Sequence, residues 1–159
     1  MSATTPAIAH PVDDFELPAT GGQRFQLSAM RGAPLVLYFY PKDDTPGCTD
    51  EGLQFAALFE AFQAQKCSIF GISRDTLKAH ERFKEKYAYP FDLLSDSEET
   101  ACALFGVMKL KNMYGKQVRG IERSTFLIDA AGVLRQEWRG VKVPGHAQQV
   151  LDALVALTR

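Results

Sequence analysis

The nine residues from Pro41 to Thr49, PKDDTPGCT, contain the side chain best suited to chemistry, Cys48. Thr45 is a favoured helix N-cap and Pro46 a favoured first helical residue, so the pattern places Cys48 at the third position of a helix. The free backbone N–H groups and the positive dipole end of a helix stabilise a thiolate there. The sequence therefore predicts a nucleophile at Cys48, in preference to the small apolar role that most free cysteines have.

Arg123 is the cation expected beside that thiolate. It directly precedes 124–128, which we expect to pair antiparallel with the central strand 35–40. In that arrangement Arg123 lies at the edge where the central strand ends and the Cys48 loop begins. A guanidinium is always charged and presents several donors in one plane, so it can stabilise a thiolate and orient an oxygen-containing substrate. Without Cys48 nearby, the better interpretation would be a solvated surface arginine.

The chain has three cysteines, an odd number at irregular spacing with no C-x-x-C pair. This pattern fits neither a disulfide framework nor a zinc ribbon. Residues 1–11 carry neither the basic residues nor the apolar run of a secretory signal, so we expect a loose lead-in and a cytoplasmic protein.

No metal site is expected. His10, His80 and His146 stand at no spacing that builds a metal site or a Cys–His pair, and we expect surface roles for them. Asp43 and Asp44 are neighbours on an extended loop, where adjacent side chains point apart. We expect both carboxylates to be solvated.

The elements that position Cys48 alternate between strand and helix. Residues 35–40 are apolar without alternation, as in a central strand covered on both faces, and Pro41 ends the run. The pattern then predicts a helix over 46–65, a strand over 68–73, a helix over 76–87, a strand over 91–94 and a short helix from 97 to 106.

The flanking segments complete the fold. Residues 15–27 predict an N-terminal β-hairpin, 109–120 a mobile stretch, 124–138 an antiparallel hairpin, and a C-terminal helix starts near Gly145. We predict an α/β, thioredoxin-like fold: a mixed central sheet with helices on both faces and an N-terminal hairpin. At 159 residues, a single domain over 1–159 is expected.

Composition excludes several functions. Hydrophobic residues make up 46% and charged residues 23%, and the net charge is −1, so nucleic acid is not expected as a partner. The longest apolar run, 35–40, is far shorter than the roughly 20 residues that cross a bilayer. No segment offers a large unbroken apolar face, so we expect a monomer.

The string Pro41-x-x-x-Thr45-x-x-Cys48 resembles the signature of the peroxiredoxins. Within that family, YPKDDTPGCT at 40–49 resembles the bacterioferritin comigratory (Q-type) subgroup, and the resemblance continues through 113–116, 120–126 and 141–146. It implies a thiol peroxidase of thioredoxin-like fold that reduces hydrogen peroxide and organic hydroperoxides without a metal or organic cofactor.

The resemblance also implies roles for individual residues. Cys48 would be the peroxidatic cysteine, Pro41 would shield its sulfur, Thr45 would bond the peroxide, and Arg123 would orient thiolate and peroxide. Attack on the terminal peroxide oxygen would release water or an alcohol and leave a sulfenic acid on Cys48.

The chain departs from this subgroup at the resolving cysteine, the residue that reacts with the sulfenic acid to regenerate the enzyme. Relatives carry a resolving cysteine at the position of Leu53 or of Lys84. Cys102, on a short helix beside a mobile segment, is the better remaining candidate for a resolving cysteine, and Cys67 the weaker one. We favour an external thiol instead, such as thioredoxin, glutaredoxin or glutathione, which would make this a one-cysteine enzyme.

Two other functions use the same thiol. A disulfide-exchange protein would need a second cysteine near Cys48, and the chain has none there. A non-enzymatic redox sensor would need only an oxidisable Cys48, without Thr45 or Arg123. Catalytic turnover of peroxide, as opposed to a single stoichiometric oxidation, separates the enzyme from the sensor.

Overall fold

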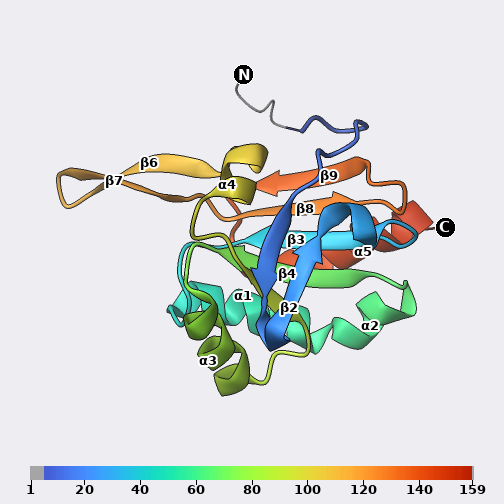
Figure 1. The fold of residues 1–159 in the computed structure, drawn as a ribbon, viewed down its shortest axis with the longest axis horizontal. Coiled ribbons are helices and arrows are strands. Elements are labelled where there is room, and N and C mark those ends of the chain that lie inside the picture. Colours follow the sequence, from blue (N-terminus) through green and yellow to red (C-terminus); the bar gives the residue numbers. More distant parts are fainter. Residues whose placement is uncertain (1–5, 159) are drawn as a thin grey trace.

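Strand β3 (Leu35–Phe39) lies inside a seven-stranded mixed sheet in the computed structural model, which describes residues 6–158 (Figure 1). All five of its residues are buried, as its unbroken apolar run predicts. It pairs in parallel with β4 (Ser68–Ser73) and antiparallel with β8 (Ser124–Ile128). The second pairing is the one on which the expected position of Arg123 depends, and it is confirmed.

The strand order of the sheet is β2-β1-β5-β4-β3-β8-β9. Its other strands are β1 (Glu16–Ala19), β2 (Gln23–Gln26), β5 (Asp92–Ser95) and β9 (Leu134–Arg139). The helices are α1 (Pro46–Ala57), α2 (Phe59–Ala64), α3 (Leu77–Tyr87), α4 (Thr100–Phe105) and α5 (His146–Thr158). Two short 3-10 turns, η1 (Thr20–Gly22) and η2 (Leu27–Met30), follow β1 and β2.

Hydrophobic layers cover both faces of the sheet. Successive side chains of β3 point to opposite faces, so Phe39 packs with Phe105 of α4, while Tyr38 stacks on Phe55 of α1. Buried side chains of α2, α3 and α5 join the layer on the α1 side. This is the predicted thioredoxin-like arrangement. None of the described helices has the length and apolar character needed to span a membrane.

The predicted helix over 46–65 is two helices in the structure. Leu58, with φ −102° and ψ 7°, leaves the helical conformation and separates α1 from α2. Periodicity did not reveal this break because the apolar spacing continues through it.

The parallel part of the sheet, β3-β4-β5, agrees with the sequence prediction within about a residue at each end.

Residues 109–120, expected to be a mobile stretch, have regular secondary structure. These residues form most of an antiparallel hairpin, β6 (Met108–Met113) and β7 (Lys116–Ile121), which extends away from the sheet (Figure 1). Its two-residue turn has positive φ at both Tyr114 and Gly115, which gives the right twist for adjoining strands. The missed signal is Gly115 between two polar strands, whose low hydrophobicity suggested a loop.

The predicted loose lead-in is also wrong for the residues that the structure describes. The Ala9 N–H donates to the Leu134 carbonyl, and Pro11 forms a β-bridge with Val133. Val12 is buried in the core. Residues 1–5 of the lead-in lie outside the described residues.

Candidate active site

Cys48 lies in the first turn of α1, at the predicted position. Thr45 is the N-cap with extended backbone (φ −99°, ψ 154°), and Pro46 is the first helical residue. The Thr49 N–H donates to the Thr45 carbonyl at 2.8 Å, which closes the first helical turn. Cys48 is only 2% exposed. Its sulfur is therefore held near free helix N–H groups in a largely desolvated position.

Arg123 lies directly against this sulfur. Its Nη2 donates to Cys48 Sγ at 3.4 Å, and its Nη1 donates to Glu51 Oε1 at 2.7 Å. The register of the sheet explains the contact: Ser124 pairs with Phe39, so the preceding arginine reaches the end of β3. Because the guanidinium is mostly buried, its attraction to a thiolate is screened less than at an open surface.

Gly47 gives the guanidinium its space. A Cβ atom at this position would lie 3.2 Å from Arg123 Nη2, closer than most Cβ contacts allow. The small residue before Cys48 is therefore explained by the packing of Arg123, and not by helix propensity, in which glycine is poor.

Glu51 is a member of this site that the sequence analysis did not identify. It follows Cys48 by three residues on α1, a spacing that places two side chains on one helix face. Glu51 is 1% exposed, and its Oε2 has no hydrogen-bond partner among the described residues. Burial raises the pKa of Glu51 to about 7, against the opposing effect of Arg123. An arginine between a thiol and a carboxylate is the central electrostatic feature of the site.

Glu51 is expected to make stability depend on pH. Its pKa rises from 4.5 to about 7 on folding, so the folded state favours the protonated carboxyl. This contribution is complete below pH 4.5 and is lost as the pH rises to about 7. Urea unfolding at about pH 4.5 and about pH 7.5 should show that Glu51→Gln loses less free energy of unfolding across this interval than the wild type. Equal losses in the two proteins would contradict the prediction.

Thr45 and Pro41 lie on the segment that joins β3 to α1, and both are partly exposed. The Thr45 hydroxyl does not cap the helix; it donates to the Lys42 carbonyl at 2.8 Å. Since the hydroxyl hydrogen is used, the oxygen is free to act as an acceptor. Pro41 directly follows the buried Tyr40 at the end of β3.

The other two cysteines lie away from Cys48. Cys102 belongs to the hydrophobic layer on the opposite face of the sheet. Cys67 shares the layer of Cys48, but it precedes Ser68, which pairs with Leu35 at the far end of β3. Five residues of strand separate the two ends, roughly 15 Å.

Both remote cysteines are poor nucleophiles in the folded protein. Burial raises the pKa of Cys67 to about 12. Burial and the neighbouring Asp96 carboxylate raise the pKa of Cys102 well above its ordinary value. The Asp96 side chain also accepts from the backbone N–H of Cys102 at 2.7 Å.

Two of the three histidines contradict the expectation of surface roles, and only His10 is exposed. His146 is buried, with Nε2 2.7 Å from Thr125 Oγ1, and burial lowers its pKa to about 4. His80 is fully buried, 2.7 Å from the Asp43 carboxylate.

The expectation of solvated aspartates holds for one of the two residues. Asp44 is exposed and bonds Lys86 and Tyr87 of α3. The Asp43 side chain is only 7% exposed, so the expectation is wrong for it. The loop lies against α3, a contact that no local pattern reveals.

Comparison with known proteins agrees with this geometry. The AhpC/TSA family matches residues 8–137. Peroxiredoxin Bcp of Xanthomonas campestris is 51% identical over 155 residues, covering 96% of this chain and 97% of the relative. Peroxiredoxin Bcp of Bacillus subtilis is 46% identical over 147 residues, covering 92% and 94%.

Solved structures lead to the same family. Peroxiredoxin Q of Xanthomonas campestris aligns with a TM-score of 0.90 at 48% identity over 100% of both chains. The bacterioferritin comigratory protein of the same species, described with alkyl peroxide reduction activity, aligns with a TM-score of 0.88 at 51% identity over 91% of this chain and 92% of its own. With these matches and a cysteine thiol held against an arginine, the chain belongs to the AhpC/TSA family, as a thiol peroxidase of the Bcp (Q-type) peroxiredoxins.

Proposed function

We propose that Cys48 is the peroxidatic cysteine of this thiol peroxidase. The observation that carries the proposal is the contact between Arg123 Nη2 and Cys48 Sγ, 3.4 Å long, in the first turn of α1. The sulfur thus lies against a cation at a helix N-terminus, the environment in which reactive cysteines are found.

The reaction is an in-line displacement on the peroxide. The Cys48 thiolate attacks the terminal oxygen, an S–O bond forms, and the O–O bond breaks with its electron pair leaving on the distal oxygen. The leaving group takes a proton and departs as water or an alcohol. The sulfur is oxidised to a sulfenic acid, and the peroxide is reduced.

The neighbouring residues bind and orient the peroxide. The Thr45 oxygen, whose own hydrogen is directed to the Lys42 carbonyl, accepts a hydrogen bond from the peroxide O–H. Arg123 stabilises the negative charge that moves from sulfur to oxygen. Pro41 shields the sulfur from water. Hydrogen peroxide and organic hydroperoxides share the terminal O–OH group that this arrangement requires.

We further propose that an external thiol, such as thioredoxin, glutaredoxin or glutathione, reduces the sulfenic acid. Three observations support this: Cys102 lies on the opposite face of the sheet, Cys67 lies at the far end of β3, and burial suppresses ionisation of both thiols. A disulfide needs Cα atoms within about 7 Å, so either pairing requires large rearrangement. Cys102 is the less unfavourable of the two, since it lies on the short helix α4.

Replacing the remote cysteines tests this route. Cys67→Ser and Cys102→Ser should each keep turnover near the wild-type rate with thioredoxin or glutathione as the reductant. Intact mass after one equivalent of peroxide should show the gain of about one oxygen atom in the wild type. A loss of about two hydrogen atoms, together with lost turnover in Cys102→Ser alone, would establish an internal disulfide instead.

The enzyme is proposed to work as a cytoplasmic monomer. Three unpaired cysteines suit a reducing compartment. Large exposed apolar side chains gather on the β6–β7 hairpin, but the cross-strand register puts Leu110 on one face and Met113 with Val118 on the other. Neither face therefore offers the continuous apolar area of a stable dimer interface.

A further inference from the structure

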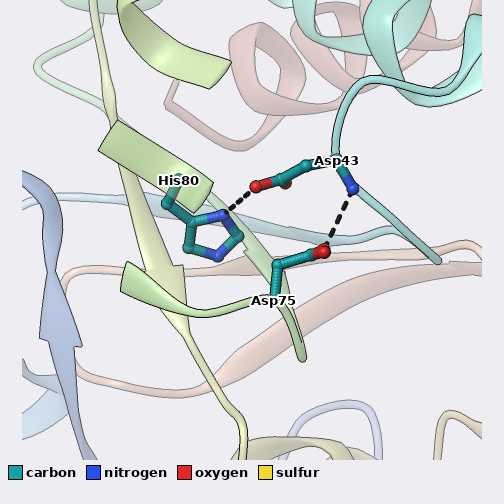
Figure 2. A group of neighbouring side chains, drawn as sticks. All are labelled: Asp43, Asp75 and His80. Carbon is teal, nitrogen blue, oxygen red and sulfur yellow. Dashed lines mark hydrogen bonds and ion pairs between the residues drawn. The ribbon is translucent and has the colours of Figure 1, made fainter. Parts of the chain in front are cut away.

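The loop before the Cys48 helix is tied to α3 by a buried hydrogen-bond network around Asp43 (Figure 2). Asp43 Oδ2 lies 2.7 Å from His80 Nδ1, and Asp43 Oδ1 accepts from the Tyr40 hydroxyl at 2.7 Å. The backbone N–H of Asp43 donates to Asp75 Oδ2 at 2.9 Å. Each of these atoms of Asp43 thus has a partner: Tyr40 on the same loop, His80 on α3 and Asp75 in the connection between β4 and α3.

The two neighbours of His80 decide where its protons lie. His80 Nε2 is 2.9 Å from the Leu94 carbonyl, which can only accept, so Nε2 carries a hydrogen. The contact between Nδ1 and the Asp43 carboxyl needs a second hydrogen. Both ring nitrogens of His80 are therefore engaged, one by the Asp43 carboxyl and one by the Leu94 carbonyl. The ring is fully buried, so water does not compete for this pair.

Asp43, Asp75 and His80 place oxygen and nitrogen atoms within 4.8 Å of one another, but these atoms already have hydrogen-bond partners in the protein. His80 Nδ1 and Asp43 Oδ2 are bonded to each other. Asp75 Oδ2 already accepts from the Asp43 N–H and from the Ser73 hydroxyl. A cation would have to break all of these bonds, so the cluster is better explained as a structural tie.

The Asp43–His80 contact, here called the tie, acts on the loop that joins β3 to α1 and carries Pro41 and Thr45. Asp43 lies between Pro41 and Thr45, and the next residue, Asp44, bonds Lys86 and Tyr87 of α3. Thr45 in turn bonds the Lys42 carbonyl. Hydrogen bonds from α3 therefore hold the loop in place, and the loop in turn positions Thr45 at the start of α1.

This arrangement has opposite consequences for the two halves of the catalytic cycle. Attack on peroxide needs Thr45, Cys48 and Arg123 in place together, which the closed loop provides. Reduction by an external thiol, which is bulkier than hydrogen peroxide, needs wider access to a sulfur on a residue that is 2% exposed, and the ordered loop limits this access.

We propose that Asp43 and His80 are positioning residues that hold the Cys48 loop in its peroxide-reactive conformation. The inference rests on the proposed role of Cys48. Neither residue touches the reacting atoms; both act through the loop on Thr45 and Cys48. Their loss should slow oxidation of the thiol without slowing reduction of the sulfenic acid.

Two substitutions at Asp43 test this inference, with Lys78→Ala on the exposed surface of α3 as the control. Asp43→Ala removes both side-chain bonds. Asp43→Asn can keep them: its Oδ1 accepts from Tyr40, and its Nδ2 donates to the Nδ1 of a neutral His80, whose Nε2–H still reaches the Leu94 carbonyl. Comparison of the two variants distinguishes loss of the hydrogen bonds to Tyr40 and His80 from loss of the carboxylate group.

The two half-reactions are measured separately. The rate constant for Cys48 oxidation by hydrogen peroxide should fall on the order of 10-fold in Asp43→Ala and should return to within about threefold of wild type in Asp43→Asn. Reduction of the sulfenic acid by dithiothreitol, and alkylation of the reduced thiol, should be as fast as in the wild type or faster. Lys78→Ala should match the wild type in every measurement.

Other results would overturn the inference. Wild-type oxidation in Asp43→Ala, an Asn variant as slow as the Ala variant, or an equal slowing of both half-reactions would each do so. Cys48→Ser separates this failure from failure of the proposed function. If Cys48→Ser still consumes peroxide, Cys48 is not the peroxidatic cysteine. If Cys48→Ser is inactive and Cys48 is oxidised at the normal rate in Asp43→Ala, only the positioning role of Asp43 and His80 is wrong.

Discussion

Cys48→Ser is expected to abolish peroxide turnover. Serine keeps the size and position of the side chain, but its hydroxyl does not ionise near neutral pH and cannot be oxidised to the sulfenic acid. The fold should be retained, because the oxygen occupies nearly the same space in the first turn of α1. Consumption of hydrogen peroxide with a thiol reductant measures the effect.

Cys67→Ser is the matched control for this loss, since it removes another buried thiol from the same hydrophobic layer. It should leave consumption nearly unchanged. If Cys48→Ser consumed peroxide at the wild-type rate, Cys48 would not be the nucleophile. If Cys67→Ser abolished consumption, reduction by an external thiol alone would be wrong.

Arg123→Ala is expected to lower the rate constant for Cys48 oxidation on the order of 100-fold. The substitution removes the cation that contacts Cys48 Sγ at 3.4 Å and that stabilises charge moving onto the peroxide oxygen. It also leaves Glu51 buried without its cationic partner, so the protein should become less stable. Stopped-flow oxidation with excess peroxide gives the rate, and thermal unfolding gives the stability.

Arg123→Lys separates the effect on rate from the effect on stability. Lysine keeps the charge but lacks the planar group that reaches Cys48 and Glu51 at the same time. Its oxidation rate should fall between those of wild type and Arg123→Ala. Arg135→Ala, on the exposed surface of β9, is the control and should oxidise normally. An Arg123→Ala enzyme that is folded and fully active would refute the assigned role.

The nucleophile and its cation could be predicted for different reasons. The prediction that Cys48 lies in the first turn of a helix depends only on local sequence, because the Thr-Pro pair before it favours a helix start wherever the loop lies. Arg123 needed one assumption about tertiary structure, that strand 124–128 pairs antiparallel with the central strand. The strand pattern was strong enough to support this assumption, and the register of Ser124 with Phe39 confirms it.

The sequence could have predicted the helix face on which Glu51 lies, but not its burial or its bond to Arg123. Its spacing of three residues from Cys48 puts both on one helix face, which the sequence does show. Its burial and its bond to Arg123 come from tertiary packing, because Arg123 is 72 residues away along the chain. An acidic residue on a helix is exposed in most proteins, so composition and periodicity favoured the wrong environment.

The sequence by itself determined the thioredoxin-like order of strands and helices, the helix N-terminus at Cys48 and the absence of cysteines at 53 and 84. These follow from local propensity and from residue identity. Only the tertiary structure decided that Asp43 lies against His80, which is 37 residues later, and that Cys102 and Cys48 are on opposite faces of the sheet. Such contacts depend on how the helices pack on the sheet, and a buried polar residue has the same local sequence signal as a solvated one.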